Sequence, residues 1–332
     1  MCCYARCTPE QANHKESSTV VAIALRMESF EPLPLTGVKS PPDSPVSGVS
    51  RRKRNPRTPR QVAEAYRGRL YELLATTDLG VRSEELEVHF AGMPVRYWPR
   101  VDSASLRWHL DIIHEFTDGL ARSNVSLAPP VLRWRHFPER GFSEVVVCAW
   151  DRLGLLAKIA GSFAAAGLNI LRADVYTRAD NVVLDVFQVC DENVRHVRDI
   201  SRLKQMEQLL MMALMNPNGA GARALQTWMR YASEPSSAND VANSATAPVV
   251  VLDNAQSEDY TVLEVQAPDR LGLLHDILEA ISACNVDIAH AIIVTEHSAA
   301  ADIFFLHDTD GRKIHDTARL ELIRAGVLAA LD

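Results

Sequence analysis

A six-residue string of acidic, basic, glycine and leucine residues occurs twice in this chain. Asp-Arg-Leu-Gly-Leu-Leu occupies residues 151–156 and returns letter for letter at residues 269–274. In each copy a strand-like segment precedes the string and a helical pattern follows it, so Asp151 is expected to cap or to introduce a helix. The amides of a first helical turn lack intrahelical partners and carry partial positive charge, which suits the carboxylate of a free amino acid.

A glycine and an asparagine complete this candidate ligand site. Gly154 lets the backbone turn and lets another molecule approach closely. Asn169 offers a donor and an acceptor for a ligand amide or ammonium group, whereas Asp287, at the corresponding position of the second copy, can only accept. The second copy is therefore expected to bind differently, to bind weakly or to serve as a structural mate. A purely structural role for both strings stays open, because strand-to-helix turns occur in many folds without a ligand.

The elements around each string repeat as well. Apolar residues with helical spacing follow each string, namely Leu156, Ile159, Ala160 and Phe163 in the first copy and Leu274, Ile277, Leu278 and Ile281 in the second. Strands are expected from Asn169 and Asp287 onward and at 182–189 and 301–306, with a second helix at 197–215 or 313–331. The order strand, helix, strand, strand, helix, with one further strand not located, predicts an α+β fold. We expect two ferredoxin-like (βαββαβ) domains, each an antiparallel sheet with its helices on one face.

Composition divides the rest of the chain. The first sixty residues hold ten Lys/Arg against five Asp/Glu and eight of the 17 prolines, so residues 1–59 are expected to be a disordered, basic tail. A helical connecting segment is predicted at 60–140, with one helix at 60–75, another that follows Asp102, an N-cap candidate, and a short strand at 131–137. The first domain is placed at 141–216, a helix and flexible linker at 217–258, and the second domain at 259–332.

Several classes of protein are excluded. No apolar run approaches the roughly 18 residues that a membrane helix needs, and the N-terminus lacks the basic start of a signal peptide. Six cysteines in 332 residues are too few for a disulfide scaffold, so we expect a cytoplasmic protein with no membrane contact. Cys2, Cys3 and Cys7 lack the paired spacing of a zinc site, and no metal is expected.

The basic run at 51–60 raises the question of nucleic-acid binding. Six positive charges in ten residues could contact phosphate, but no aromatic residue interleaves for base stacking. The 272 residues outside the first sixty carry 25 basic and 37 acidic side chains, a net charge of −12. We therefore interpret the run as part of a solvated tail.

Longer stretches around the two strings resemble the ACT domains, small regulatory modules that bind amino acids at the interface between paired copies. The closer similarity is to the C-terminal tandem of the bacterial PII uridylyltransferase/uridylyl-removing enzyme. It is carried by residues 147–161, 166–170 and 185–187 in the first copy and by 291–295 and 302–306 in the second. Residues 89–98 resemble the segment ahead of the first ACT unit in that enzyme, so the resemblance covers roughly residues 60–332.

This resemblance implies a regulatory protein that senses glutamine and nitrogen status and is non-catalytic by itself. In the family, a nucleotidyltransferase and an HD phosphohydrolase domain lie upstream, and this chain offers no room for them. It has no Gly-Ser segment followed by an Asp-x-Asp pair, and the His-Asp dipeptides at 275, 307 and 315 all fall in the second copy. No catalytic residue and no cofactor is therefore expected, although the assignment as an enzyme is left open. The ligand residues implied are Asp151, Arg152, Leu153, Gly154, Leu155, Asn169, Ile170, Asp269, Arg270, Leu271, Gly272, Leu273 and Asp287.

Two alternatives to a free-standing sensor stay open. The chain could be a truncated or split uridylyltransferase that acts with a separate catalytic chain or with a PII-type signal protein. It could also be an interaction module whose ACT units bind no ligand and pair only with each other or with a second copy.

Overall fold

The computed structural model describes residues 59–75, 83–122, 129–193, 195–215, 247–296 and 299–331. The expected disordered tail of residues 1–59 lies outside these ranges except for its last residue, as does most of the expected helix and linker of 217–258. The chain divides into two compact units, Met1–Leu110 and Asp111–Asp332, and each is described by itself.

The N-terminal unit is helical. It contains α2 (Pro59–Ala75), α3 (Ser83–Gly92), the 3-10 helix η1 (Val95–Arg100) and the first turns of α4 (Ser103–Arg122). The predicted cap at Asp102 is confirmed, because its Oδ1 accepts from the Ser105 N–H at 2.7 Å. Phe90 of α3 stacks on Trp98 with ring centroids 4.4 Å apart. α3 is not predicted from the sequence, since this helix of ten residues contains three glutamates and presents only one apolar turn.

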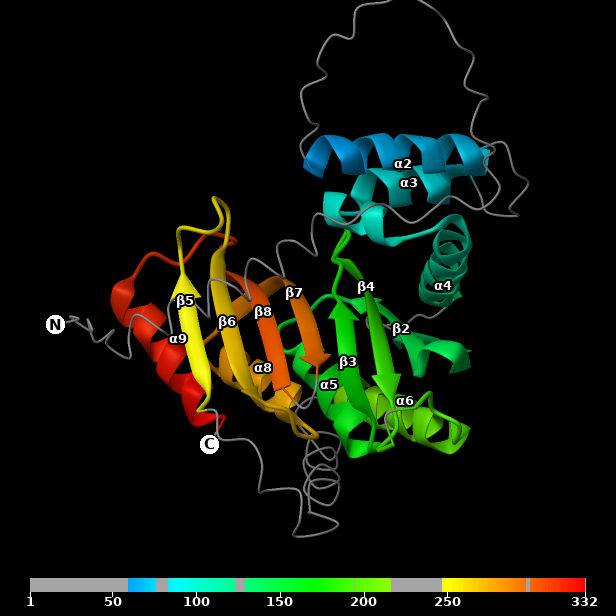
Figure 1. Ribbon diagram of the computed structural model, residues 1–332. Helices are drawn as coiled ribbons and strands as arrows, with labels where there is room; N and C mark the ends of the chain where they lie inside the picture. Colours follow the sequence, from blue (N-terminus) through cyan, green and yellow to red (C-terminus); the bar gives the residue numbers. More distant parts are fainter. Residues whose placement is uncertain are drawn as a thin grey trace, which may run out of the picture. The chain divides into compact units, whose positions relative to one another are not determined.

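One continuous sheet runs through the described part of the C-terminal unit, with eight antiparallel strands (Figure 1). The first repeat supplies β1 (Val131–Phe137), β2 (Phe142–Trp150), β3 (Asn169–Asp174) and β4 (Val182–Cys190). The second repeat supplies β5 (Val249–Asp253), β6 (Thr261–Pro268), β7 (Val286–Glu296) and β8 (Ala299–Asp308). The spatial order β1-β2-β4-β3-β7-β8-β6-β5 joins the repeats edge to edge at β3 and β7. Asp174 lies opposite Ile292, its own counterpart in the repeat, which marks a pseudo-two-fold axis.

Four helices lie on the same face of this sheet (Figure 1). They are α5 (Leu155–Ala165) and α6 (Ile200–Met215) in the first repeat, and α8 (Leu273–Ala283) and α9 (Thr317–Ala329) in the second. The α+β class with antiparallel strands and helices on one face is therefore confirmed. No helix in the described ranges has the length and apolar character needed to cross a membrane.

The further strand of each domain precedes its repeat instead of ending it. β1 pairs with β2, and β5 pairs with β6, so each repeat has the chain order ββαββα where βαββαβ is expected. The first of these strands is the one predicted at 131–137, although that segment was expected to lie outside the domain, and the second falls in the segment expected to be linker. The position beside β2, and the equivalent position beside β6, can be filled by a strand that precedes the repeat or by one that follows it. The sheet of each domain is complete in both arrangements.

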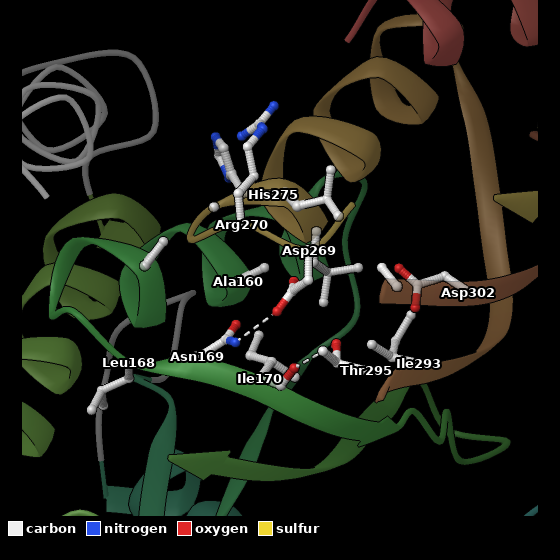
Figure 2. A pocket seen from close by; sticks show the side chains of 15 residues that line it. Ala160, Leu168, Asn169, Ile170, Asp269, Arg270, His275, Ile293, Thr295 and Asp302 are labelled. Carbon is white, nitrogen blue, oxygen red and sulfur yellow. Dashed lines mark hydrogen bonds between the residues drawn. The ribbon is translucent and has the colours of Figure 1, made fainter. Parts of the chain in front are cut away.

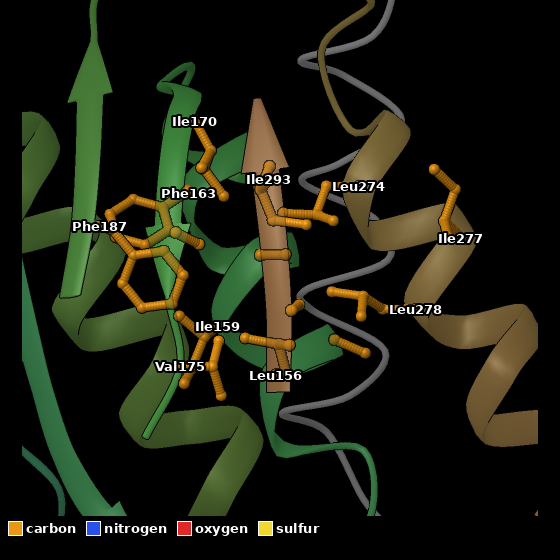
Figure 3. Packing of buried hydrophobic residues seen from close by; sticks show 14 of the residues in the cluster. Leu156, Ile159, Phe163, Ile170, Val175, Phe187, Leu274, Ile277, Leu278 and Ile293 are labelled. Atoms are coloured by element: carbon orange, nitrogen blue, oxygen red, sulfur yellow. The ribbon is translucent and has the colours of Figure 1, made fainter. Parts of the chain in front are cut away.

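Both repeats share a single hydrophobic core. Leu156 and Ile159 of α5 and Leu274 and Leu278 of α8 belong to the same buried cluster, with Ile293 of β7 among them (Figure 3). These helical residues are those that the apolar spacing predicts. Because the core crosses the junction, the two repeats are expected to fold as one body.

Candidate functional site

Each repeated string forms the turn between a central strand and the helix that follows it. The N-cap residue is the glycine, Gly154 with φ 73° before α5 and Gly272 with φ 85° before α8, and neither helix has a side-chain cap. A positive φ favours glycine at this position. Asp151 lies three residues before the N-cap and does not cap the helix, so of its two expected roles the cap is wrong, and it lies where the chain enters the helix. The first-turn amides of both helices are consequently not satisfied by a capping side chain.

Two pockets lie between the repeats, and each combines the turn of one repeat with a strand start of the other. The Asn169 pocket is shown in Figure 2; it is lined by Asn169, Ile170, Asp269, Arg270, Gly272 and Leu273, among others. The Asp287 pocket is lined by Asp151, Arg152, Leu153, Gly154, Leu155 and Asp287, among others. The structure thus joins Asn169 to the string of the second repeat, whereas it is expected from the sequence to act with the string of the first. Leu271 lines neither pocket.

In the Asn169 pocket a hydrogen bond joins the two repeats. Asn169 Nδ2 donates to Asp269 Oδ2 at 2.9 Å, and Figure 2 shows the two side chains pointing toward each other. The Thr295 hydroxyl donates to the Ile170 carbonyl at 3.4 Å from the same side. Burial raises the pKa of Asp269, while the Asn169 hydrogen bond and the charge of Arg270 act in the opposite direction. The cost of burying the Asp269 carboxylate is therefore partly offset by these two interactions.

The Asp287 pocket has a different charge balance. Burial raises the pKa of Asp151, and the nearby Asp287 carboxylate raises it further. His307 Nε2 lies 3.8 Å from Asp287 Oδ2. Two acidic side chains thus face each other where the Asn169 pocket has an asparagine and an aspartate. The side chain at the strand start cannot donate a hydrogen bond to a ligand.

The arginines of the two strings have structural partners. Arg152 donates to the Leu214 carbonyl and Arg270 to the Ala330 carbonyl, each at 3.2 Å, at the C-terminal end of the second helix of the same repeat. Arg270 also pairs with Asp276 at 2.6 Å. Cationic side chains stabilise the unpaired carbonyls at helix C-termini. Each guanidinium group therefore connects its turn to the end of the second helix of the same repeat, although both residues also line a pocket.

A histidine lies on the pseudo-two-fold axis. His275 Nδ1 donates to the Ala157 carbonyl at 2.8 Å, and the two residues are 118 positions apart. That separation is the offset of the repeat, so His275 contacts its own counterpart. The buried imidazole links α5 to α8 where the two helices cross the axis.

Two buried aspartates were not predicted as site residues. Asp302 on β8 lines the Asn169 pocket, and Asp185 on β4 lines the Asp287 pocket. Each accepts from a backbone amide, Asp302 from Val294 at 3.3 Å and Asp185 from Tyr176 at 3.2 Å. Burial raises the pKa of Asp302 to about 8. The feature of the sequence that could indicate these two aspartates is an acidic residue in the middle of an apolar strand, repeated in both copies.

Metal ligation receives no support within the described ranges. No group of three or more His, Cys, Asp or Glu side chains there is arranged to hold a metal ion. The His-Asp dipeptides of the second repeat have other surroundings, since His275 bonds to Ala157 and Asp316 caps α9 by accepting from the Ala318 and Arg319 amides.

Comparison with known proteins agrees with this architecture. Residues 249–329 match a family model described as "ACR9-like, ACT-like domain". The bifunctional uridylyltransferase/uridylyl-removing enzyme of Gluconobacter oxydans (strain 621H) is 32% identical over 235 residues, which cover 71% of this chain and 24% of that enzyme. The enzyme of the same name from Rhodospirillum rubrum is 29% identical over 265 residues, 80% of this chain and 26% of that enzyme. The Caulobacter vibrioides (strain NA1000 / CB15N) enzyme is 34% identical over 203 residues, 59% of this chain and 20% of that enzyme.

The family model covers the second repeat. The second repeat is an ACT-like domain, and the first has the same order of elements, the same string and the same sheet. The chain spans about a quarter of the length of the curated relatives it matches.

Proposed function

We propose that the two ACT domains form a regulatory sensor in which a free amino acid binds between them. The observation that carries this proposal is the pairing of an uncapped helix N-terminus from one repeat with a polar strand start from the other. The amides at the start of α8 suit the ligand carboxylate, and Asn169 and Asp269 suit its nitrogen-bearing groups. Its proposed location is the cytoplasm.

The Asn169 pocket is the proposed binding site, and the Asp287 pocket is the proposed structural mate. Asn169 can donate to a ligand oxygen and accept from a ligand amide, because an asparagine side chain does both. Asp287 places a second carboxylate near Asp151, which repels a ligand carboxylate and offers no donor. One amino acid per chain is the expected stoichiometry.

Binding must change the junction between the repeats. The Asn169 pocket encloses a cavity of about 20 Å³ and the Asp287 pocket one of about 40 Å³. A single water molecule needs about 10–15 Å³ of such space, so neither cavity admits an amino acid as it stands. The ligand therefore binds an opened junction, and this preference is what makes it an effector.

Glutamine is the proposed ligand, because it is the amino acid that the family resemblance implies. Isothermal titration calorimetry of the folded chain against glutamine, glutamate, asparagine and serine tests this. We expect glutamine to bind at about one site per chain, and Asn169→Asp to weaken it by about tenfold or more, the cost of one lost hydrogen bond next to a charged group. Absence of heat for every amino acid, with a normal unfolding transition, would refute the sensor.

A second candidate function is favoured by the comparisons. Relatives named uridylyltransferase/uridylyl-removing enzyme match 59–80% of this chain. The chain would then regulate such chemistry, with a catalytic uridylyltransferase chain or a PII-type signal protein as its partner. Adding the chain to a uridylylation assay that contains these partners should make the rate depend on glutamine. A glutamine response that is the same with and without the chain would contradict this role.

A further inference from the structure

The carboxyl group of Asp302 is buried without a full set of partners. The residue is 3% exposed, and its only hydrogen bond within the described ranges joins Oδ1 to the Val294 N–H at 3.3 Å, a long distance. The carboxyl group lines the Asn169 pocket, next to Ile293 in Figure 2. A buried carboxyl with an open acceptor position is costly unless something binds to it.

Asp185, the counterpart in the first repeat, has different surroundings. It is 1% exposed and accepts from the Tyr176 amide. The buried guanidinium of Arg178 lies in the same region, since Arg178 and Asp185 both act on the pKa of the Cys148 thiol. Asp302 is influenced by Asp269, another acid, and by no cation among the described residues. The charges that surround the two equivalent aspartates therefore differ.

The remaining polar groups of the Asn169 pocket do not neutralise Asp302. The charged and titratable side chains that line the pocket with it are Asp269, Arg270 and His275. Arg270 is held by Asp276 and the Ala330 carbonyl, and His275 Nδ1 is held by the Ala157 carbonyl. The donors of Arg270 and His275 Nδ1 are consequently engaged away from Asp302.

We infer that Asp302 receives the primary ammonium group of the amino acid that binds in the Asn169 pocket, with Asp269 as the second acceptor. This inference rests on the proposed sensor function and deepens it by naming the group of the ligand that is read. A primary ammonium group brings three donors and one positive charge, which complement two carboxyl groups. The ligand carboxylate then lies toward the N-terminus of α8.

Ligand binding in this arrangement releases a proton. Burial holds the pKa of Asp302 at about 8, so at pH 7 the empty pocket contains the neutral carboxylic acid. An ammonium group beside it favours the carboxylate. The ligand enters as its zwitterion with the ammonium group protonated, Asp302 loses its proton to the buffer, and the pair of ammonium and carboxylate remains in the pocket.

Calorimetry with glutamine at pH 7, in buffers of different ionisation enthalpy, measures this proton directly. We expect the wild-type chain to release close to one proton per glutamine bound, and to release progressively less as the pH is raised above 8. N-acetylglutamine, which lacks the ammonium group, should not bind. Proton uptake or no exchange, or binding of N-acetylglutamine as tight as that of glutamine, would overturn the inference while leaving the sensor intact.

Two matched variants locate the proton. Asp302→Asn should abolish the release and weaken glutamine binding by about tenfold or more, whereas Asp185→Asn, the same change at the counterpart position, should keep the release. Unchanged release in Asp302→Asn would overturn the inference.

A probe without an amino-acid backbone separates the two proposals. If no amino acid binds, the sensor function fails, and the Asp302 inference is then decided by methylammonium chloride. This salt should raise the unfolding temperature of the wild-type chain above that in tetramethylammonium chloride of equal ionic strength, and should not do so for Asp302→Asn. Equal behaviour of the two salts would overturn it.

Discussion

The Asn169 pocket and the Asp287 pocket share a backbone and differ in chemistry. Both place a glycine N-cap beside a strand start of the other repeat, yet one junction is closed by an amide-to-carboxylate hydrogen bond and the other sets two carboxylates near each other. A duplicated fold has thus kept its geometry, while the side chains at 169 and 287 and the surroundings of Asp302 and Asp185 differ between the two pockets. The comparison teaches that the strings alone do not define a ligand site.

The largest expected effect tests whether the two repeats are one folding unit. Phe187 and its counterpart Phe304 are each fully buried in the shared core. Either change, Phe187→Ala or Phe304→Ala, should lower the free energy of unfolding by about 3–5 kcal/mol, because each leaves a cavity. Calorimetric melting should show one transition for the C-terminal unit in both variants. Two transitions, with only the mutated repeat shifted, would mean that the repeats are independent.

The next largest effect is a pH dependence of the free energy of unfolding that distinguishes Asp302 from Asp185. An aspartate in the unfolded chain ionises near pH 4, whereas the pKa of Asp302 in the folded chain is about 8. The folded state thus retains a proton that the unfolded state loses, so this group stabilises the fold at low pH and its contribution declines as the pH rises from about 4 to 8. Between pH 5 and 7 the free energy of unfolding should fall by about 1.4 kcal/mol per pH unit from this source.

Urea unfolding at pH 5, 6 and 7 measures this slope. Asp302→Asn should remove that share of the slope, and the matched variant Asp185→Asn shows how much any buried aspartate contributes. A wild-type slope that Asp302→Asn leaves intact would show that Asp302 is ionised in the fold.

A third prediction converts one pocket into the other. Asp287→Asn restores the asparagine of the Asn169 pocket and relieves the repulsion of Asp151. Calorimetry should then detect a second glutamine site. Its affinity should lie within about tenfold of the first, which is the difference that one modest hydrogen bond can make. The stoichiometry is the readout, since it rises from about one to about two. A stoichiometry that stays at one would assign the difference to other residues of the pocket, such as Asp185.

The smallest effect concerns the axis. His275→Ala removes the hydrogen bond to the Ala157 carbonyl and part of the packing between α5 and α8. The expected loss is about 1–2 kcal/mol in the free energy of unfolding, measured by urea titration. His315→Ala, at an exposed position of the same repeat, serves as the control and should change it by less than about 0.5 kcal/mol. Equal losses in the two variants would mean that the axial contact contributes little.

Much of the fold follows from the sequence because its signals are local. The apolar spacing after each string predicts α5 and α8, and the alternating segments predict β3, β4, β7 and β8. β5 falls in the predicted linker, since a strand of five residues beside a Ser- and Ala-rich stretch has little periodicity of its own. Its assignment depends on pairing with β6, which is a tertiary contact.

The site was predictable only in part, for the same reason. The string residues and Asn169 stand out by repetition, but which string Asn169 faces depends on how β3 and β7 join. The roles of Arg152 and Arg270 at helix ends are equally invisible, because their carbonyl partners lie about sixty residues away. Asp302 carried a sequence signal that gains meaning only with the pocket beside it.

The contact of His275 with Ala157 has a consequence for how the repeats choose their partners. A pair made of two first repeats would set alanine against alanine at this place and would lack the imidazole hydrogen bond. A pair made of two second repeats would set histidine against histidine and crowd the contact. The axis therefore favours association of the two unlike repeats over association of like ones.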